Sequence, residues 1–337
     1  MVILNTRHKL LAVGGVMALA AGLSVAQMFG GRGFGRGRGG FGGFGGGYRG
    51  MGSPDEPLIS TEGGDTVNEE TVRTAREIAT HSAGADTPVW SNSPGFEKDV
   101  FTFTRIIYNW TSSNPQMSRF PGMTRWINDF PDCDLDISYR LHQMTSLRVD
   151  PDGRVIKLTS PELLSYPFIY MEKPAGLELK DEDVAILRKY LLNGGALMAD
   201  DIWGDTQWES FAAQIKRVLP ERNWTELKMD HPVFHSVFDL KAKEVEELQV
   251  PPIQRWARGV NTGLYGGYGS FRGDGDPDMH VRAWLDDKGR IMVICTHNTD
   301  DGDGWEREGE DVEYFKTFSE PRAYPLGINI IYYLMTH

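Results

Sequence analysis

The chain has only two cysteines among its 337 residues, Cys133 and Cys295, and they lie far apart in the sequence. It contains no Cys-x-x-Cys pair and no cysteine–histidine spacing of the kind that binds zinc, so neither a zinc finger nor a dithiol redox motif is expected. The two residues could form one disulfide in an exported protein or remain as thiols. Because Cys295 lies inside the apolar run RIMVICTH, we favour two buried thiols.

Acidic residues are missing from residues 1–50, which hold six of the 35 lysine and arginine residues. Residues 51–337 then carry 29 basic against 47 acidic residues, which is a net charge of −18. A body with this charge repels phosphate, so no nucleic acid is expected as a partner. The sequence also has no internal repeat.

The first 26 residues have the pattern of a secretion signal. Two basic residues, Arg7 and Lys9, precede an apolar run that ends in the small residues SVA at positions 24–26. We expect cleavage there, so that the mature chain begins at or near Gln27. The alternative is an uncleaved membrane anchor, since the apolar run of roughly 17 residues is at the short edge of what spans a bilayer. Both alternatives predict export to the periplasm or the cell envelope.

Residues 27–52 are rich in glycine, arginine and aromatic residues, as in GGRGFGRGRGGFGGFGGGYRGMG. Such a composition cannot bury enough apolar surface to offset the loss of backbone entropy, so we expect a disordered tether. In a cytoplasmic protein the tract would suggest RNA binding. Behind a secretion signal, we expect its positive charge to contact a membrane or wall surface instead. Residues 53–99 are polar, with one helical patch near NEETVRTAREIATHSA, and are predicted to form a linker or an N-terminal extension.

Residues 100–337 alternate between strand and helix patterns. Short apolar runs predict strands at DVFTFTRIIYN, GRVIKL, YPFIYM, ALMADD and GRIMVICTHN. Helices are predicted over KDEDVAILRKYLLNGG, over DTQWESFAAQIKRVLP with Trp208 in the core, and over PLGINIIYYLMTH. Helices between strands at this spacing predict a single main α/β domain with a mainly parallel, doubly wound sheet that is covered on both faces.

The segment from FTFTRIIYN to INIIYYLMTH resembles the domain-of-unknown-function family 4159. The matching pieces, in order, are LTSPELLSYPFIYM, LRKYLLNGGALMADDIWG, RVLPERNWTELKMDHPVFHSVF, GRIMVICTHNTDDGDGWE and LGINIIYYLM. The resemblance implies a class I glutamine-amidotransferase-like α/β fold of the flavodoxin-like type, in bacterial exported or membrane-attached proteins. Amidotransferases of that fold place a cysteine on a strand-to-helix elbow, and neither MADDIWGD nor CTHNTDDG has a cysteine at that point. Thiol amidotransferase chemistry is therefore not expected.

Two adjacent carboxylates, Asp200 and Asp201, end the apolar strand ALMADD directly before a helix. Ligands of doubly wound sheets collect at the carboxyl ends of the strands, so both aspartates and the neighbouring Trp203 are candidate ligand-binding residues. The alternative is a structural corner, in which Asp200 bonds backbone N–H groups and an aspartate caps the next helix, for which Asp205 is better placed. Because successive side chains of a strand point to opposite sides, only one of the pair is expected to face a common site.

A second acidic cluster, THNTDDGDGWERE, follows the strand GRIMVICTHN, and its Asp300 and Asp301 are further candidate ligand-binding residues. If residue 299 is counted as the first position of a twelve-residue calcium loop, Asp301, Asp303 and Glu310 fall at ligand positions. A divalent cation is therefore a candidate cofactor. The alternative is a surface loop rich in aspartate and glycine that forms ordinary turns.

Two histidines, His231 and His297, complete the candidate ligand-binding residues. His231 precedes a proline and is expected to be extended, so its four-residue spacing to His235 is not a helical metal pair. Each histidine alone is more often a hydrogen-bonded structural residue. They could line one pocket with Asp201 and Asp300 if their strands are neighbours.

Three functions are compatible with these patterns. The first is a non-catalytic domain of the cell envelope that binds a small ligand or an envelope protein, which fits the missing cysteine nucleophile. The second is a hydrolase with a carboxylate and histidine site, metal-assisted in one version, that acts on glycans or peptides. The third is a structural component of an envelope complex. For the first two, the loop at 259–280, rich in glycine and tyrosine, would cover a site at the strand ends.

Overall fold

The computed structural model describes residues 58–61, 63–95, 99–109, 126–253, 275–306, 308 and 311–337. The predicted secretion signal and tether lie outside the described residues, as does most of the predicted cover loop. From Leu58 onward, the described residues belong to one compact unit. No helix among them is long and apolar enough to cross a bilayer.

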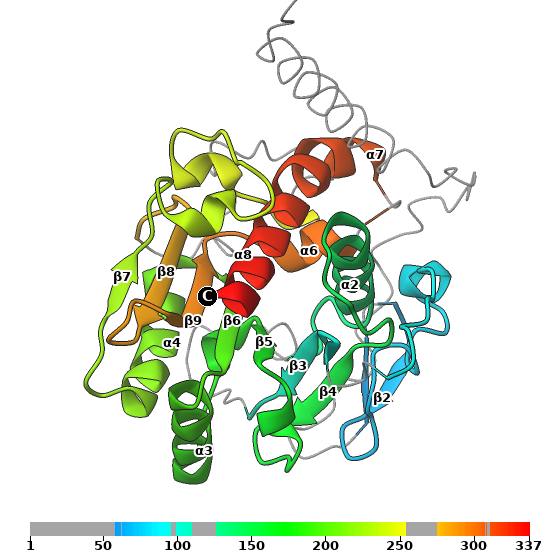
Figure 1. Ribbon diagram of the computed structural model, residues 1–337, viewed down its shortest axis with the longest axis horizontal. Coiled ribbons are helices and arrows are strands. Elements are labelled where there is room, and N and C mark those ends of the chain that lie inside the picture. Colours follow the sequence, from blue (N-terminus) through cyan, green and yellow to red (C-terminus); the bar gives the residue numbers. More distant parts are fainter. Residues whose placement is uncertain are drawn as a thin grey trace, which may run out of the picture. The chain divides into compact units, whose positions relative to one another are not determined.

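A central sheet of seven strands is formed within the described ranges. Its strands are β3 (Thr104–Ile107), β4 (Arg154–Lys157), β5 (Phe168–Glu172), β6 (Ala196–Ile202), β7 (Trp224–Glu226), β8 (His280–Leu285) and β9 (Ile291–His297). They lie in the order β4-β3-β5-β6-β9-β8-β7 (Figure 1), and the first five in this order are parallel. The prediction of a mainly parallel α/β sheet of the flavodoxin-like type is confirmed. The antiparallel edge formed by β7 and β8 was not predicted.

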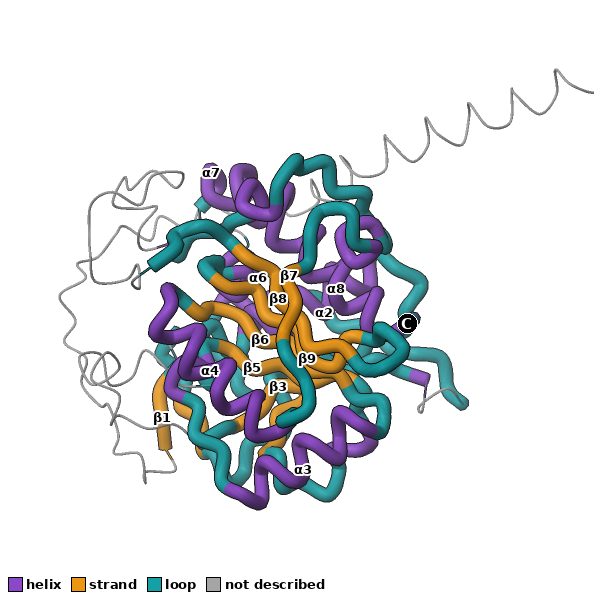
Figure 2. The backbone as a smooth tube through the Cα atoms, turned by 90° about the vertical axis from the view of Figure 1, so that its left-hand side faces the viewer, coloured by secondary structure: helices purple, strands orange, loops and turns teal. Residues whose placement is uncertain are grey.

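Helices cover both faces of this sheet (Figure 2). One face carries α3 (Asp181–Leu192) and α4 (Gly204–Val218), and the other carries α2 (Asp132–Met144), α6 (Asp301–Glu306) and α8 (Tyr324–Thr336). The short helix α7 (Val312–Tyr314) and the π-helix η7 (Phe315–Ala323) lead into α8. Short 3-10 helices lie at η1 (Ala83–Asp86), η3 (Leu163–Ser165), η4 (Pro174–Gly176), η5 (Pro232–His235) and η6 (Val245–Leu248). The predicted helices correspond to α3, α4 and α8, whereas α2 was not predicted.

The two faces of the sheet bury different side chains. Aliphatic residues such as Leu187 of α3 and Ile215 of α4 fill one face, and Trp208 packs there against Trp284, in the core as predicted. The opposite face holds an aromatic cluster of Phe103, Phe168, Tyr170 and Trp305, whose ring centroids lie 5.0 to 6.4 Å apart in neighbouring pairs. Tyr170 of this cluster donates its hydroxyl to Glu172 at the end of β5.

The described residues between 58 and 95 pack against the main sheet. A hairpin of β1 (Leu58–Ser60) and β2 (Thr66–Asn68) buries Val67 completely, and Ala75 is also fully buried. The backbone N–H of Ala75 donates to the carbonyl of Asp152 at 3.0 Å, next to β4. The segment therefore contributes to the hydrophobic core of the domain.

The helix predicted near NEETVRTAREIATHSA is wrong, because these residues form turns that lead into η1. Side chains compete for the backbone donors that a helix would use. The side-chain oxygen of Asn68 accepts from the N–H of Glu70 at 2.9 Å, and Glu77 accepts from Thr74 N–H at 3.2 Å.

Candidate functional site

The carboxyl end of β5 carries a glutamate into the protein interior. Every position of this strand is buried, so its last residue, Glu172, is 0% exposed. The hydroxyl of Tyr170 donates to Oε2 of Glu172, whereas Oε1 has no hydrogen-bond partner within the described ranges. Burial raises the pKa of Glu172 well above its usual range, and the nearby carboxylates of Asp129 and Asp200 raise it further. A buried acceptor without a donor is costly, so this oxygen requires an explanation.

The residue after β5 supplies a positive charge to the same strand ends. Lys173 has a left-handed backbone with φ of 50°, and the hydroxyl of Tyr108 donates to its carbonyl at 3.0 Å and to that of Glu172 at 2.8 Å. This turn directs the ammonium group of Lys173 to Asp201, with which it forms an ion pair. Burial lowers the pKa of Lys173, but the carboxylates of Asp201 and Asp300 outweigh it and raise the pKa above its usual value.

A bulge at the end of β6 changes how Asp200 and Asp201 are arranged. The pairing with β9 shifts between Ala199 and Ile202, and Asp201 has a φ of 56°. A bulge of this kind interrupts the regular alternation of side chains along a strand. Both aspartates are fully buried, and the indole of Trp203 donates to Asp201.

Asp200 makes the kind of bond that the structural-corner alternative predicted. Its carboxylate accepts from the hydroxyl of Thr296 at 2.6 Å and from the backbone N–H of Gly302 at 2.9 Å, so it joins β6 to β9 and α6. Burial raises the pKa of Asp200 to about 7. The capping part of that alternative is wrong, because α4 begins at Gly204 with Trp203 in the N-cap position, and Asp205 is exposed.

The segment after β9 is held in place by hydrogen bonds to two other parts of the chain. Asn298, with φ of 59°, donates its N–H to the carbonyl of Ile202 at 2.7 Å and accepts from Gly204 N–H at 2.8 Å. The N–H of Asp300 donates to the carbonyl of Val250 at 3.0 Å. These bonds fix the position of Asp300 opposite Glu172 and Asp201.

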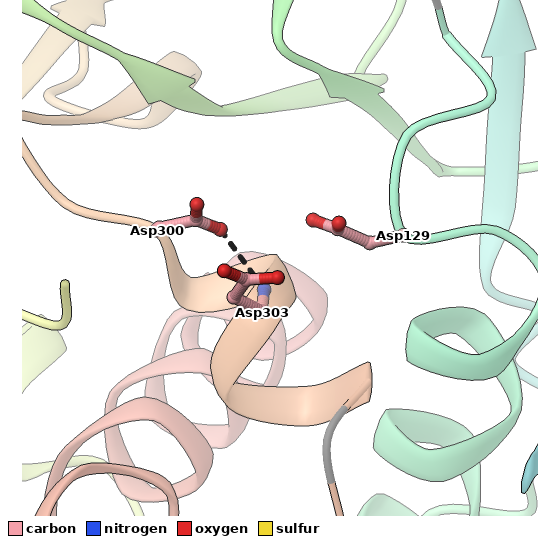
Figure 3. Close-up of side chains that lie close together, drawn as sticks. All are labelled: Asp129, Asp300 and Asp303. Carbon is pink, nitrogen blue, oxygen red and sulfur yellow. Dashed lines mark hydrogen bonds between the residues drawn. The ribbon is translucent and has the colours of Figure 1, made fainter. Parts of the chain in front are cut away.

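Two groups of three carboxylates result, and they share Asp300. We call Glu172, Asp201 and Asp300 the first acidic trio, and Asp129, Asp300 and Asp303 the second acidic trio. Within each trio, one carboxylate oxygen per residue lies within 4.8 Å of the others, and every member is buried. Figure 3 shows the second acidic trio, in which Asp129 and Asp300 point toward one another from the α2 and α6 sides. Either trio has the donor set of a hard divalent cation.

Asp129 reaches this position because a buried arginine organises the turn before α2. Arg105 of β3 is fully buried and forms a forked ion pair with Asp134 of α2, with Nε–Oδ1 of 2.9 Å and Nη2–Oδ1 of 2.6 Å. Its Nη1 donates to the carbonyls of Trp126 at 2.7 Å and Asn128 at 3.0 Å. Asp129 follows these carbonyls with a left-handed φ of 57°.

The histidines lie in other surroundings. His297 is buried on the α4 face, where its ring packs against Trp208, and its Nδ1 is 3.0 Å from Nη1 of Arg282. Burial, with the positive charge of Arg282, lowers the pKa of His297 to about 3, so it is neutral. His231 accepts from the N–H of Val233 at 3.2 Å and packs against Tyr333 of α8. With these contacts, His231 and His297 do not line one pocket with Asp201 and Asp300, which was one possibility from the sequence.

The calcium-loop pattern does not correspond to the local structure, because residues 301–306 form the helix α6. Asp303 instead joins Asp129 and Asp300, while Asp301 is buried near Asp200. The surface-loop alternative also differs from the structure, since Asp300, Asp301 and Asp303 are all buried. Glu310 lies outside the described residues.

Both cysteines are buried free thiols, as the sequence favoured. Burial raises the pKa of each thiol well above its usual range. Cys133 accepts from Nη2 of Arg105 at 2.8 Å and lies in the Arg105–Asp134 contact. A reactive cysteine needs a stabilised thiolate, so these environments are those of structural residues.

Sequence reasoning missed Glu172, Lys173 and Asp129. The rule that selected Asp200, a polar residue directly after an apolar strand, applies equally to Glu172 after FIYM and could have found it. Asp129 follows no strand in the sequence, and only the fold brings it to the site.

Glu172, at the end of β5, lies beside the point where the chain reverses its direction across the sheet. From β3 the chain adds β4 on one side, then returns to add β5 on the other, so the ends of β3 and β5 flank a topological switch point. Ligand sites of open α/β sheets favour this position.

Residues 103–335 match the model of a family described as a domain of unknown function (DUF4159). No curated protein matches the chain.

Proposed function

The chain belongs to the DUF4159 family, a domain of unknown function, and we propose that it binds a hard divalent cation as a non-catalytic, ligand-binding domain of the cell envelope. The observation that carries this proposal is the first acidic trio, whose three buried carboxylates come from the ends of β5, β6 and β9 and offer oxygens within 4.8 Å of one another. A cation held there would join three neighbouring strands.

The donor chemistry favours Mg²⁺, Mn²⁺ or Ca²⁺. The first acidic trio offers only carboxylate oxygens, which these ions prefer, whereas structural zinc is usually held by cysteine and histidine. Lys173 and Trp203 each use one oxygen of Asp201. An ionised carboxylate has about four lone-pair sites, so Asp201 keeps capacity for a further ligand.

Glu172 provides the second line of support. Its Oε1 is buried in the trio without a hydrogen-bond donor from the described part of the chain. Burial and the neighbouring carboxylates raise the pKa of Glu172, so its ionised form needs a positively charged partner. A divalent cation between Glu172, Asp201 and Asp300 would supply that partner for all three carboxylates.

A buried ion site supports a binding role rather than turnover. The members of the first acidic trio are at most 2% exposed. An ion shielded in this way stabilises the fold and shapes the strand ends around it, as in structural metal sites.

The proposed location in the envelope rests on the secretion-signal pattern of residues 1–26. N-terminal sequencing of exported protein tests it, and a chain that still begins at Met1 would contradict cleavage.

Calorimetric titration tests the cation site. Protein stripped with a chelator is titrated with Mg²⁺, Mn²⁺, Ca²⁺ and Zn²⁺, alongside Asp300→Asn and the control Asp287→Asn, whose carboxylate is 86% exposed at the β8–β9 turn. We expect binding of at least one of the first three ions, at least tenfold weaker binding in Asp300→Asn, and unchanged binding in the control. Equal affinity in Asp300→Asn and the wild type would refute the site.

Lys173 favours a second candidate function, a metal-assisted hydrolase of glycans or peptides. Its ammonium group faces Asp201 at the edge of the sheet where α/β enzymes place their sites. A bound cation would supply Lewis-acid chemistry, and a nearby ammonium can stabilise developing negative charge. Hydrolysis of a glycan and peptide panel that is lost on chelation and in Asp300→Asn would establish this function. A panel without turnover, together with cation binding, would leave the binding role.

A further inference from the structure

The second acidic trio lies directly beside the first. Asp303 lies in the first turn of α6, and its backbone N–H donates to Oδ1 of Asp300 at 2.9 Å, which orients the Asp300 carboxylate (Figure 3). Asp129 completes the trio from the turn before α2. Asp300 belongs to both trios, so one of its carboxylate oxygens lies within 4.8 Å of oxygens of Glu172 and Asp201, and one lies within 4.8 Å of oxygens of Asp129 and Asp303.

Gly302 shows how closely the two trios approach each other. A Cβ atom at this position would lie 2.5 Å from Oδ2 of Asp129 and 2.9 Å from Oε2 of Glu172, which is closer than real Cβ contacts. Carboxylates of both trios therefore converge on Gly302, one of the two glycines of α6. The buried Oε1 of Glu172, without a donor from the described residues, belongs to the same group of carboxylates.

From these contacts we propose that the site holds two divalent cations, with Asp300 as the bridging carboxylate between them. This inference rests on the proposed function, because the first cation is the one held by the first acidic trio. The second would be held by Asp129, Asp300 and Asp303. Paired cations in proteins lie about 3.5–4 Å apart and commonly share a carboxylate, which is the arrangement that Asp300 offers. The ligands are again carboxylate oxygens, so Mg²⁺ or Mn²⁺ is the expected pair.

The test counts the ions bound to the full chain and asks whether they are neighbours. Manganese stoichiometry is measured by equilibrium dialysis and native mass spectrometry, and electron paramagnetic resonance separates two exchange-coupled Mn²⁺ ions from isolated ones. We expect two ions with a coupled spectrum in the wild type. We expect one ion with an isolated six-line spectrum in both Asp129→Asn and Glu172→Gln, and weakening of both ions in Asp300→Asn.

The variants are chosen so that they can fold. Asparagine has nearly the same shape as aspartate, and it tolerates the left-handed backbone at position 129 better than most residues do. Asp129→Asn should therefore fold. Asp303→Asn serves as a second variant. In the wild type, Oδ2 of Asp303 accepts from the N–H of Ile253 at 2.7 Å, and the amide oxygen of asparagine can accept the same bond. Asp287→Asn is the control and should keep two ions.

Each outcome decides between the two proposals. One ion in the wild type that is retained in Asp129→Asn and Asp303→Asn but lost in Glu172→Gln would refute the second cation and leave the proposed function intact. Two ions without magnetic coupling would refute the shared bridge. No bound ion in the wild type would refute the proposed function and this inference together.

Discussion

The ammonium group of Lys173 forms an ion pair with the carboxylate of Asp201 at the point where β5 and β6 end side by side. Asp201 is fully buried and the Lys173 side chain is 17% exposed, so the pair lies almost entirely out of water. Lys173 therefore supplies positive charge to the first acidic trio in the protein without bound metal, and it should oppose a cation at the same carboxylate.

Lys173→Met should lower stability and raise cation affinity at once. Without its partner, Asp201 is a buried unpaired charge, so the chelator-treated protein should lose about 3–5 kcal/mol of unfolding free energy. Mg²⁺ should bind at least roughly tenfold more tightly, because a positive charge a few ångströms away opposes it by about 1 kcal/mol or more. Denaturant melts and calorimetry measure both effects. Lys157→Met, which removes an exposed pair with Glu70, should change neither by more than about 1 kcal/mol. Unchanged Mg²⁺ affinity in Lys173→Met would contradict a site at Asp201.

Glu172→Gln should separate binding from stability. Removing a buried acid whose pKa is raised by burial and neighbouring carboxylates should leave the chelator-treated protein as stable as the wild type or more stable. The rise in melting temperature that divalent cations produce should shrink or disappear, since one ligand is lost. Thermal melts with and without Mg²⁺ measure this.

Asp134→Asn is the matched comparison for Glu172→Gln, because Asp134 is equally buried but forms an ion pair with Arg105. It should lose about 3–5 kcal/mol whether or not cations are present, because it leaves a buried arginine without its partner. If Glu172→Gln behaves like Asp134→Asn, the glutamate has a structural role and is not a metal ligand.

Gly302→Ala should destabilise the protein, although the same substitution in an ordinary helix stabilises it by roughly 1 kcal/mol. The added methyl group would lie against Asp129 and Glu172. We expect loss of stability together with weaker Mn²⁺ binding, measured by denaturant melts and equilibrium dialysis. A stabilised variant with wild-type binding would show that these carboxylates do not approach Gly302.

His297→Gln should reduce the loss of stability in acid. Burial and the charge of Arg282 lower the pKa of His297 to about 3, compared with about 6.5 in the unfolded chain. The unfolded chain therefore binds the extra proton first. The contribution of His297 is complete above pH 6.5 and is lost as the pH falls toward 3, by an amount on the order of 4 kcal/mol. Urea midpoints at pH 7 and pH 4 should differ less in the variant than in the wild type. An equal difference would show that His297 titrates normally.

The strands and helices of the fold could be predicted where the apolar or helical pattern of the sequence extended over many residues. The alternation of short apolar runs with helices α3, α4 and α8 predicted the parallel part of the sheet. β7 is only three residues long and has an exposed tryptophan, so its sequence carries little strand signal. Helix α2 contains five buried polar or charged residues, which breaks the usual apolar stripe of a helix.

The site could be predicted only in part, because its members obey different rules. Asp201 and Asp300 follow apolar strands, and this position pointed to both. The strand-alternation argument did not anticipate the bulge after Ala199, which no residue type in ALMADD signals, although only Asp201 of the aspartate pair belongs to the trios. Asp129 depends on the long-range contact between Arg105 and Asp134, which the sequence does not reveal.

The most direct test of the cation site is a crystal structure of the protein grown with Mn²⁺ and measured at a wavelength where manganese scatters anomalously. We expect an anomalous peak roughly 2.0–2.6 Å from carboxylate oxygens of Glu172, Asp201 and Asp300, the range for hard cations with oxygen ligands. Crystals of Asp300→Asn grown in the same way should lack this peak. Wild-type crystals that bind manganese only at surface carboxylates, with Glu172 Oε1 hydrogen-bonded to water or protein, would contradict the account.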